Sequence, residues 1–348
     1  MTSKAVLLLL IIACCALGCD GDRVSPSQGG YMFRAPANFP EATYTFNNNP
    51  ITQEGFELGR FLFYDPILSS DSTVACANCH QQSKSFADPV HRFSKGVNDA
   101  SGIRNAPAIQ NMAFQEQFFW DGGVNHLDFV PINAITNELE LHETLANVVN
   151  KLARNESYAT RFQKAFGTPE LNSQKMLFAL SQFMAMMVSA NARYDHYVRG
   201  EGESLTPEEL VGMKLFQQKC ASCHATDLFT DGTFRNNGLD TDFEKDEGRS
   251  RVTEREGDRG KFKVPSLRNA ELTAPYMHDG RFNTLEKVLD HYRNAVADSE
   301  TLDPLLRQGS AMGIVMSEEE KTQIIAFIKT LTDREFITDK RFSAPVVK

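Results

Sequence analysis

The sequence predicts an all-α protein built from two helical domains that pack against each other. Three observations support this fold class. Amphipathic runs with helix-capping residues occur almost throughout the chain. One five-residue pattern occurs twice, at residues 76–80 and 220–224, and each copy follows such a run. The length of about 330 residues that remains after an N-terminal leader suits two domains.

Residues 1–18 predict a signal peptide for export. Lys4 precedes an unbroken apolar stretch over residues 5–17, which is too short to span a membrane. Residues 16–19 resemble a lipoprotein signal, in which Cys19 becomes the lipid-modified first residue. Plain cleavage near Cys19 is the alternative. Both interpretations predict an exported protein in the periplasm, and the lipid would be its only link to a membrane.

Composition narrows the class of partner. The formal net charge is −9 over 348 residues, which provides no basic surface for nucleic acid. Residues 19–49 are rich in Ser, Pro, Gly and Asn and lack an apolar period. They therefore predict a tether and an irregular lead-in to the first domain.

Helix-start signals precede both copies of the repeated pattern. Thr52 opens an amphipathic run, and Thr206 is followed by Pro at the first helical position and by Glu three residues after the cap. The two runs share a Gly-x-x-Leu-Phe pattern that starts at Gly59 and at Gly212. This weak internal repeat predicts two similar helical units.

The repeat places the N-terminal domain at residues 50–200 and the C-terminal domain at residues 201–348. Residues 143–165 and 174–197 predict long helices inside the first domain. Ser317, with Glu three residues later, predicts the start of a final helix.

The repeated pattern is Cys-x-x-Cys-His, which is the attachment site of c-type haem. Both thiols bond the porphyrin and the imidazole ligates iron, so the sequence predicts two covalent haems. A pair of disulfides or a zinc site is the alternative. Zinc is disfavoured because each cysteine pair has its own adjacent His. The residues concerned are Cys76, Cys79 and His80 in the first copy and Cys220, Cys223 and His224 in the second.

These motifs in an exported helical chain resemble the bacterial di-haem cytochrome c peroxidase and MauG family. The resemblance covers residues 50–333 and rests on further segments in the same order. They read G-I-R-N-A-P at residues 102–107, F-W-D-G at 119–122, P-S-L-R-N at 265–269 and T-A-P-Y-M-H-D-G at 273–280. The resemblance implies two cytochrome-c-like domains, each carrying one covalent haem c, that meet at an interface.

The same resemblance implies a role for each haem. The haem ligated by His80 would be the peroxidatic one, and the haem ligated by His224 would store or pass electrons. Trp120, the only tryptophan of the chain, falls where the family has an indole between the haems. A calcium ion between the haems would be bound by the Asn105 side chain and by two carbonyl oxygens, an all-oxygen set that suits a hard cation. These carbonyls belong to Thr273 and Pro275.

The sixth ligand of the second haem divides the family. Its peroxidases have Met fourteen residues after the His of the H-D-G segment. Fourteen residues after His278 is Tyr292, as in MauG. An anionic phenolate favours the ferric state, whereas a thioether raises the reduction potential. The neighbouring His291 is the alternative ligand.

The first haem is expected to have an open site for peroxide. Family members that block it use a His about eight residues before the Asn of R-N-A-P, and that position is Val97 here. His91 lies in the same loop but out of register, and it is the alternative blocking ligand.

Peroxide cleavage also requires a group that moves a proton between the two oxygens. The family uses a Glu twenty residues after the Trp, which is Glu140, and Glu138 is the alternative. The family's Gln and Pro in this segment are replaced by Val130 and Ala134, so the peroxide pocket of the first haem differs from that of the family.

The resemblance implies a di-haem peroxidase that reduces hydrogen peroxide to water with electrons from a small periplasmic donor, either a cytochrome c or a cupredoxin. One alternative is a MauG-like enzyme that oxidises a residue of a partner protein. An alternative of another class is a di-haem electron carrier, and an open iron near a carboxylate argues against it. Family peroxidases are often homodimers, and the sequence does not fix this state.

Overall fold

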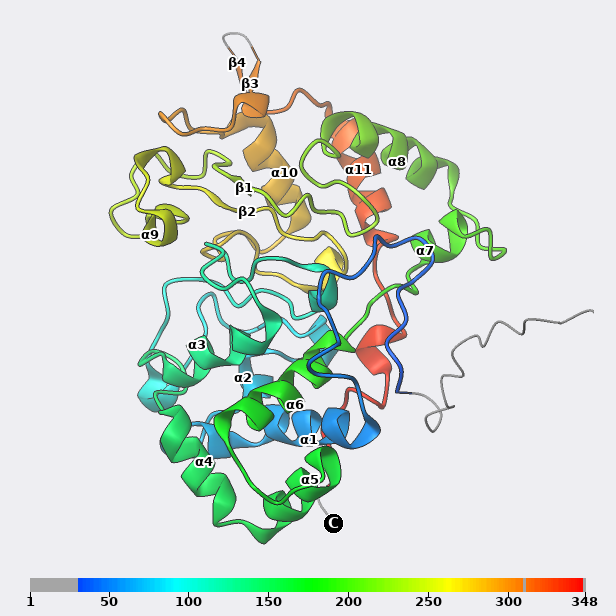
Figure 1. Ribbon diagram of the computed structural model, residues 1–348. Helices are drawn as coiled ribbons and strands as arrows, with labels where there is room; N and C mark the ends of the chain where they lie inside the picture. Colours follow the sequence, from blue (N-terminus) through cyan, green and yellow to red (C-terminus); the bar gives the residue numbers. More distant parts are fainter. Residues whose placement is uncertain (1–30, 309–310, 347–348) are drawn as a thin grey trace, which may run out of the picture.

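The computed structural model describes residues 31–308 and 311–346 (Figure 1). This part of the chain is rich in helices, which supports the helical character of the predicted all-α class, and it also has four short strands. The predicted signal peptide and Cys19 lie outside the described residues. No helix among those described is long and apolar enough to cross a membrane.

The secondary structure consists of many short elements joined by irregular segments. The helices are α1 (Gln53–Tyr64), α2 (Cys76–Cys79), α3 (Val130–Thr136), α4 (Leu145–Ala153), α5 (Glu156–Phe166), α6 (Ser173–Ala185), α7 (Arg193–Val198), α8 (Pro207–Lys219), α9 (Ser250–Thr253), α10 (Leu285–Asn294) and α11 (Glu318–Lys329). The strands are β1 (Phe234–Arg235), β2 (Phe262–Lys263), β3 (Arg307–Gln308) and β4 (Ala311–Met312). They pair antiparallel, β1 with β2 and β3 with β4.

The predicted helix starts are confirmed. The Thr52 hydroxyl accepts a hydrogen bond from Gly55 N at 3.0 Å at the start of α1. Thr206 and Ser317 each form a complete capping box, in which the Glu three residues later returns a bond to the backbone of the cap. A side-chain oxygen satisfies amide groups that the first helical turn leaves unpaired.

The two predicted long helices are each interrupted, so that prediction was wrong. Asn155 ends the first run and caps α5 through a bond from Ser157 N to its side chain at 3.0 Å. After α6 the chain becomes extended, and the backbone N–H of Asn111 donates to the Met187 carbonyl. Apolar periodicity continues across the first break because α4 and α5 pack on the same core, whereas α7 follows α6 but places Tyr194 against the core of the second half.

The two halves of the chain occupy opposite ends of the molecule in Figure 1, with α1 to α6 at one end and α8 to α11 at the other. The last described segment returns from α11 to the first half. Phe336 and Phe342 pack in the core of that half, although the sequence placed them with residues 201–348. Two isolated phenylalanines carry no signal that assigns them to one core or the other.

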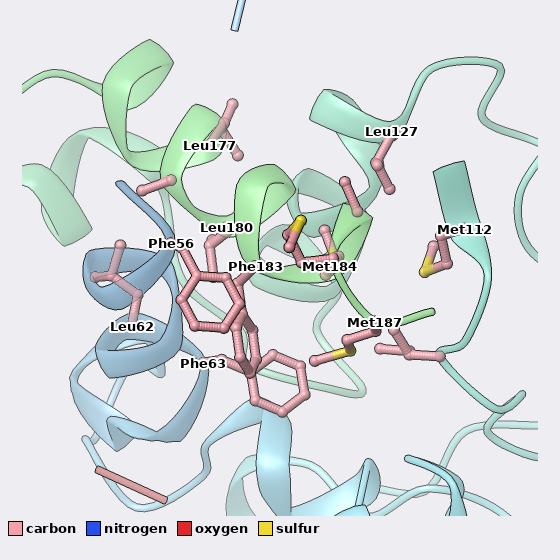
Figure 2. Close-up of a cluster of buried hydrophobic side chains, with 14 of the residues drawn as sticks. Phe56, Leu62, Phe63, Met112, Leu127, Leu177, Leu180, Phe183, Met184 and Met187 are labelled. Carbon is pink, nitrogen blue, oxygen red and sulfur yellow. The ribbon is translucent and has the colours of Figure 1, made fainter. Parts of the chain in front are cut away.

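Figure 2 shows the centre of the first core. The rings of Phe56 and Phe63 both pack against Phe183, with centroid separations of 5.3 and 5.2 Å. These three side chains are at most 1% exposed. Met184 and Met187 extend the same cluster from the end of α6. The aromatic contacts therefore fix the crossing of α1 and α6 that lies beneath the first Cys-x-x-Cys-His motif.

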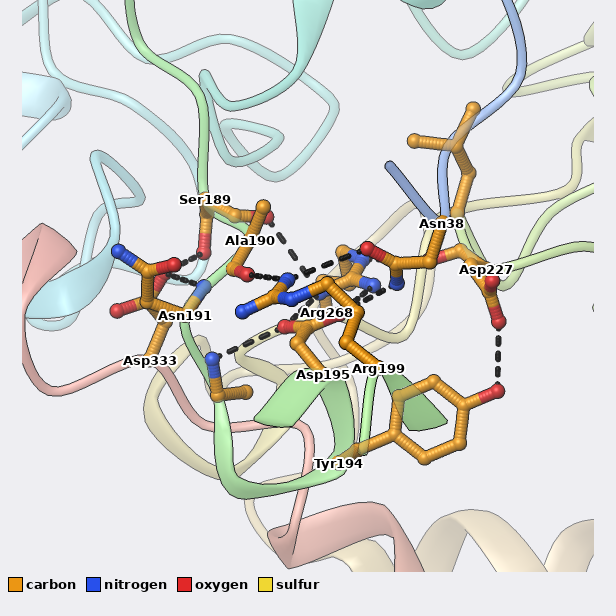
Figure 3. A network of polar contacts seen from close by, with 12 residues as sticks. Asn38, Ser189, Ala190, Asn191, Tyr194, Asp195, Arg199, Asp227, Arg268 and Asp333 are labelled. Carbon is orange, nitrogen blue, oxygen red and sulfur yellow. Dashed lines mark hydrogen bonds and ion pairs between the residues drawn. The ribbon is translucent and has the colours of Figure 1, made fainter. Parts of the chain in front are cut away.

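A buried ion pair joins the halves (Figure 3). Arg268 donates from both terminal nitrogens to Asp195, at 2.7 and 2.9 Å, and both side chains have no exposed surface. Asn38 Nδ2 and Ala192 N donate to the same carboxylate, each at 2.9 Å. The Arg268 Nε donates to the Asp227 carbonyl at 2.6 Å. Segments distant in sequence are thus held at one point by a fully satisfied polar network.

The internal repeat has a physical basis in two helix crossings. Gly59 of α1 faces Ala179 of α6, and a Cβ atom at Gly59 would overlap the Ala179 carbonyl. Gly212 of α8 meets the Gln323 carbonyl of α11 in the same manner. Each half therefore needs a glycine where two helices approach closely.

We expect Gly59→Ala and Gly212→Ala each to lower the free energy of unfolding by about 1–3 kcal/mol, because the added methyl group must push two helices apart. Gly257→Ala is the matched control, since a Cβ at Gly257 meets no atom within 4 Å. Denaturant unfolding of the intact protein measures the effect. Equal stability of all three variants would contradict the close-crossing explanation.

Candidate functional site

One large cavity lies between the two halves of the molecule. Its volume is about 1690 Å³, and residues of both Cys-x-x-Cys-His motifs line it. The predicted site residues that line this same cavity are Cys76, Cys79, His80, Asn105, Trp120, Glu140, Cys220, Cys223, His224, Thr273, Pro275 and Tyr292. The fold therefore brings together groups that are up to about two hundred positions apart in the chain.

The first motif includes the short helix α2 and the second forms a turn directly after α8, and both line the cavity with their cysteines and histidine. The backbone N–H of His80 donates to the Cys76 carbonyl, and that of His224 donates to the Cys220 carbonyl, each at 2.9 Å. In the first copy, Asn78 steadies the turn by accepting the Ala75 amide at 2.8 Å. The shared geometry explains why the spacing Cys-x-x-Cys-His recurs without change.

Backbone carbonyls orient both imidazoles. His80 Nδ1 lies 2.8 Å from the Phe86 carbonyl, and His224 Nδ1 lies 3.2 Å from the carbonyls of Phe229 and Pro265. A carbonyl accepts only, so Nδ1 carries the proton and the Nε2 lone pair is left for a metal. Burial lowers the pKa of both histidines, which favours the neutral, ligating form.

The four cysteines of the motifs are all free thiols, so neither motif forms a disulfide. Burial raises the pKa of Cys76 and of Cys220 to about 12 and that of Cys79 to about 11. Among the described residues, no cluster of three or more His, Cys, Asp or Glu side chains could hold a metal ion. The donor set thus fits two separate haems, each with two thiols and one imidazole, better than a shared zinc ion.

The structure separates the two candidate sixth ligands on α10. Tyr292 lines the cavity, and burial raises its pKa to about 12. The adjacent His291 is buried, but its Nε2 lies 3.0 Å from the Asn237 carbonyl and the side chain does not line the cavity. Of these two side chains, only that of Tyr292 is therefore accessible to a group held in the cavity.

Contact with the cavity also distinguishes the candidate acid-base groups and the candidate blocking ligand near the first motif. Glu140 lines the cavity, whereas Glu138 is exposed and does not. Asn137 Nδ2 donates to Glu140 Oε1 at 2.8 Å, and burial raises the pKa of this carboxyl. His91 lies away from the cavity with its Nδ1 3.0 Å from Asp88 Oδ2. The structure thus offers Glu140, and not His91, to the space beside His80.

Trp120 lines the cavity that the two motifs share. Its indole Nε1 donates to the Asn105 carbonyl at 2.9 Å, and its ring lies edge-on to His278 at a centroid separation of 6.5 Å. Asn105 also donates from its backbone N–H to the His278 carbonyl at 2.7 Å and from Nδ2 to the Arg92 carbonyl at 3.2 Å. The predicted calcium ligands border the same junction, and the ion itself stays a prediction.

Sequence reasoning missed three side chains of this junction. Phe262 stacks on His278 at a centroid separation of 3.6 Å, and Arg104 holds carboxylates from both halves, Asp121 and Asp246. Lys263 enters the cavity from β2. Arg104 lies inside the G-I-R-N-A-P segment, so the resemblance could have indicated it as a site residue. Phe262 and Lys263 belong to a strand of two residues that no periodicity could reveal.

A helical protein with two Cys-x-x-Cys-His motifs around one cavity belongs to the class of di-haem c-type oxidoreductases. Residues 53–203 match the di-haem cytochrome c peroxidase family. The chain is 33% identical over 302 residues to the methylamine utilization protein MauG of Methylorubrum extorquens, with 86% of this chain and 83% of that protein covered. It is 32% identical over 280 residues to the cytochrome c551 peroxidase of Nitrosomonas europaea, with 79% of each covered.

The comparison with a solved structure agrees with these sequence comparisons. A crystal structure of a MauG-like protein associated with microbial copper homeostasis superposes with a TM-score of 0.82 at 32% identity. The match covers 91% of this chain and 99% of that one. The chain therefore belongs to the di-haem cytochrome c peroxidase and MauG family.

We expect the intact mass of the exported protein in denaturant to exceed that of its polypeptide by two haems, because four free thiols border the cavity in two pairs. A double variant, Cys220→Ser with Cys223→Ser, should lose one covalent haem and retain the other. A mass increase of one haem or none in the unmodified protein would overturn the two-haem assignment.

Proposed function

We propose that this protein reduces hydrogen peroxide to water at the first motif, with electrons that arrive through the second. The observation that carries this proposal is the single cavity lined by both motifs, with Glu140 and Trp120 on its wall. Peroxide takes up two electrons and two protons to give two molecules of water. A haem ligated by His80 would supply the iron at which the oxygen–oxygen bond is cleaved.

Glu140 would move the proton that cleavage requires. In its ionised form it accepts a proton from the nearer peroxide oxygen, and in its protonated form it delivers that proton to the leaving oxygen. The bond from Asn137 restrains one carboxylate oxygen, so the other is free to face the cavity. Burial raises the pKa of Glu140 above its usual value, which makes this carboxyl a better proton acceptor than an exposed one.

Trp120 would lie on the path of electrons between the two haems. The indole is anchored by the Asn105 carbonyl and borders the cavity that the two motifs share. A fixed aromatic ring between two redox sites shortens each electron-transfer step. The calcium ion that we propose between the haems would be held by Asn105, Thr273 and Pro275.

A second candidate function is the oxidation of a residue in a partner protein, the alternative implied by the resemblance to MauG. Tyr292 is the observation that favours it. An anionic phenolate opposite His224 would stabilise oxidised iron, whereas the thioether of peroxidase members favours reduction. Two electrons could then be withdrawn from a partner rather than from a small donor.

The remaining proposals concern location and partners. Export to the periplasm, with lipidation of Cys19 as anchor, places the protein where a cytochrome c or cupredoxin donor is available. Domains over residues 50–200 and residues 201–348, with the tail returning to the first core, would each hold one haem. A homodimer is proposed from the family alone.

Glu140→Gln should slow the reaction with peroxide by about 100-fold or more, because the amide cannot accept a proton. In the unmodified protein the rate should rise as pH increases through the raised pKa of Glu140, since only the carboxylate accepts the proton. Stopped-flow absorbance against pH measures both effects. Glu138→Gln is the control, and an equal loss in that variant would contradict the assignment of Glu140.

The resting ferric protein should react with peroxide without prior reduction, because His91 is held away from the cavity by Asp88.

Tyr292→Met should raise the reduction potential of the second haem by on the order of 100 mV, since a neutral thioether replaces an anion. Spectroelectrochemical titration and stopped-flow mixing measure the two effects. Inertness until half-reduction would identify His91 as a blocking ligand, and an unchanged potential would exclude Tyr292 as a ligand.

A further inference from the structure

Lys263 extends from β2 into the cavity at the junction of the two halves. Its backbone N–H donates to the Trp120 carbonyl at 2.7 Å. Its Nζ donates to Gln115 Oε1 and to the Gln117 carbonyl, each at 2.8 Å. An ammonium group has three N–H donors, so these bonds leave one without a partner among the described residues.

The surroundings of Lys263 contain no negative charge to balance it. Its two acceptors are neutral, and the centroid of the Phe118 ring lies 6.0 Å from Nζ. In the described part of the chain no carboxylate forms an ion pair with Lys263, and burial lowers its pKa to about 8. A charge buried without a counter-charge is unfavourable, which indicates that a group outside the polypeptide completes the site.

Three arginines of the same cavity differ from Lys263 because each already holds a carboxylate. Arg104 pairs with Asp121 and Asp246, Arg235 with Asp231 and Asp303, and Arg268 with Asp195. The protein itself therefore satisfies those cations. Arg251 lies exposed at the cavity rim, where water can solvate its charge.

We propose that Lys263 binds a carboxylate, and that this carboxylate is a propionate of one of the two haems. The proposal rests on occupation of the cavity by haem, as inferred above. Haem carries two propionates that are anionic at neutral pH, and each needs a donor when the group is enclosed. The free N–H of Lys263 would form a charge-assisted hydrogen bond with one of them.

The position of Lys263 gives this bond a second consequence. The same residue binds the propionate through Nζ and the Trp120 carbonyl through its backbone. The carboxylate, Lys263 and the segment of Trp120 would then form one connected path between a cofactor and the proposed electron relay. Lys263 would act here as a cofactor-binding and positioning residue, since it does not touch the peroxide.

The test compares the reduction potentials of three variants. Lys263→Met removes the charge, Lys263→Arg keeps it, and Lys261→Met makes the same charge change two residues away. Lys261 is the matched control because it pairs with Asp258 at 3.2 Å and does not line the cavity. Spectroelectrochemical titration resolves the two haems, and intact mass confirms that both are attached.

We expect the potential of one haem in Lys263→Met to fall relative to Lys261→Met, because the propionate loses its counter-charge and favours ferric iron. The fall should reach about tenfold in the reduction equilibrium constant, or about 59 mV for one electron. Lys263→Arg should show a smaller fall. The proposal is overturned if neither haem in Lys263→Met shifts by that amount.

A second measurement uses the unmodified protein and remains decisive even where Lys263→Met does not fold. A crystal structure of the haem-loaded protein should place a propionate oxygen within about 4 Å of Lys263 Nζ. A structure with both haems bound and no propionate oxygen within that distance overturns the proposal for Lys263 but not the proposed peroxidase function. Absence of haem from the purified protein would instead overturn the function proposed above.

Discussion

The ion pair between Arg268 and Asp195 is the contact on which the shared cavity depends. Its two side chains are fully buried, so the desolvation cost of both charges must be offset by their hydrogen bonds. Burial alone would raise the pKa of Asp195, yet the bonds from Arg268 hold it below the usual value. Arg268 also lies 4.4 Å above the ring of Phe39. Removal of either partner would leave an uncompensated charge at the point where the halves meet.

The two halves that meet at this ion pair share the same local arrangement of three features. A glycine allows two helices to cross closely, a single turn presents two thiols and an imidazole, and a backbone carbonyl five or six residues later orients the imidazole. The carbonyls belong to Phe86 and Phe229, which both have positive φ angles, at 60° and 54°. Such angles are unfavourable for phenylalanine, so the surrounding fold must enforce them. Local backbone strain therefore serves the ligand geometry in both halves.

The halves differ where their chemistry must differ. Beside His80 the cavity wall has a buried carboxyl group, Glu140, and beside His224 it has a phenol, Tyr292. A proton-transfer group suits a site that accepts substrate, whereas an anionic ligand suits a site that stores oxidising equivalents. Trp120 and Lys263 line the same cavity. The two parts of the cavity thus offer different chemical groups, although a similar backbone arrangement builds both.

The sequence by itself determined the family and the helix starts and predicted the haem attachment residues, because each depends on residues a few positions apart. Cys-x-x-Cys-His fits within one helical turn, and a Thr or Ser cap acts on the amides that follow it. Only the tertiary structure showed that Glu140 and Tyr292 line the cavity, whereas Glu138, His291 and His91 do not. It also assigned Phe336 and Phe342 to the first core and placed Lys263 beside Trp120. These features depend on contacts between distant segments, where a small rotation of a helix or loop turns a side chain into or out of the cavity.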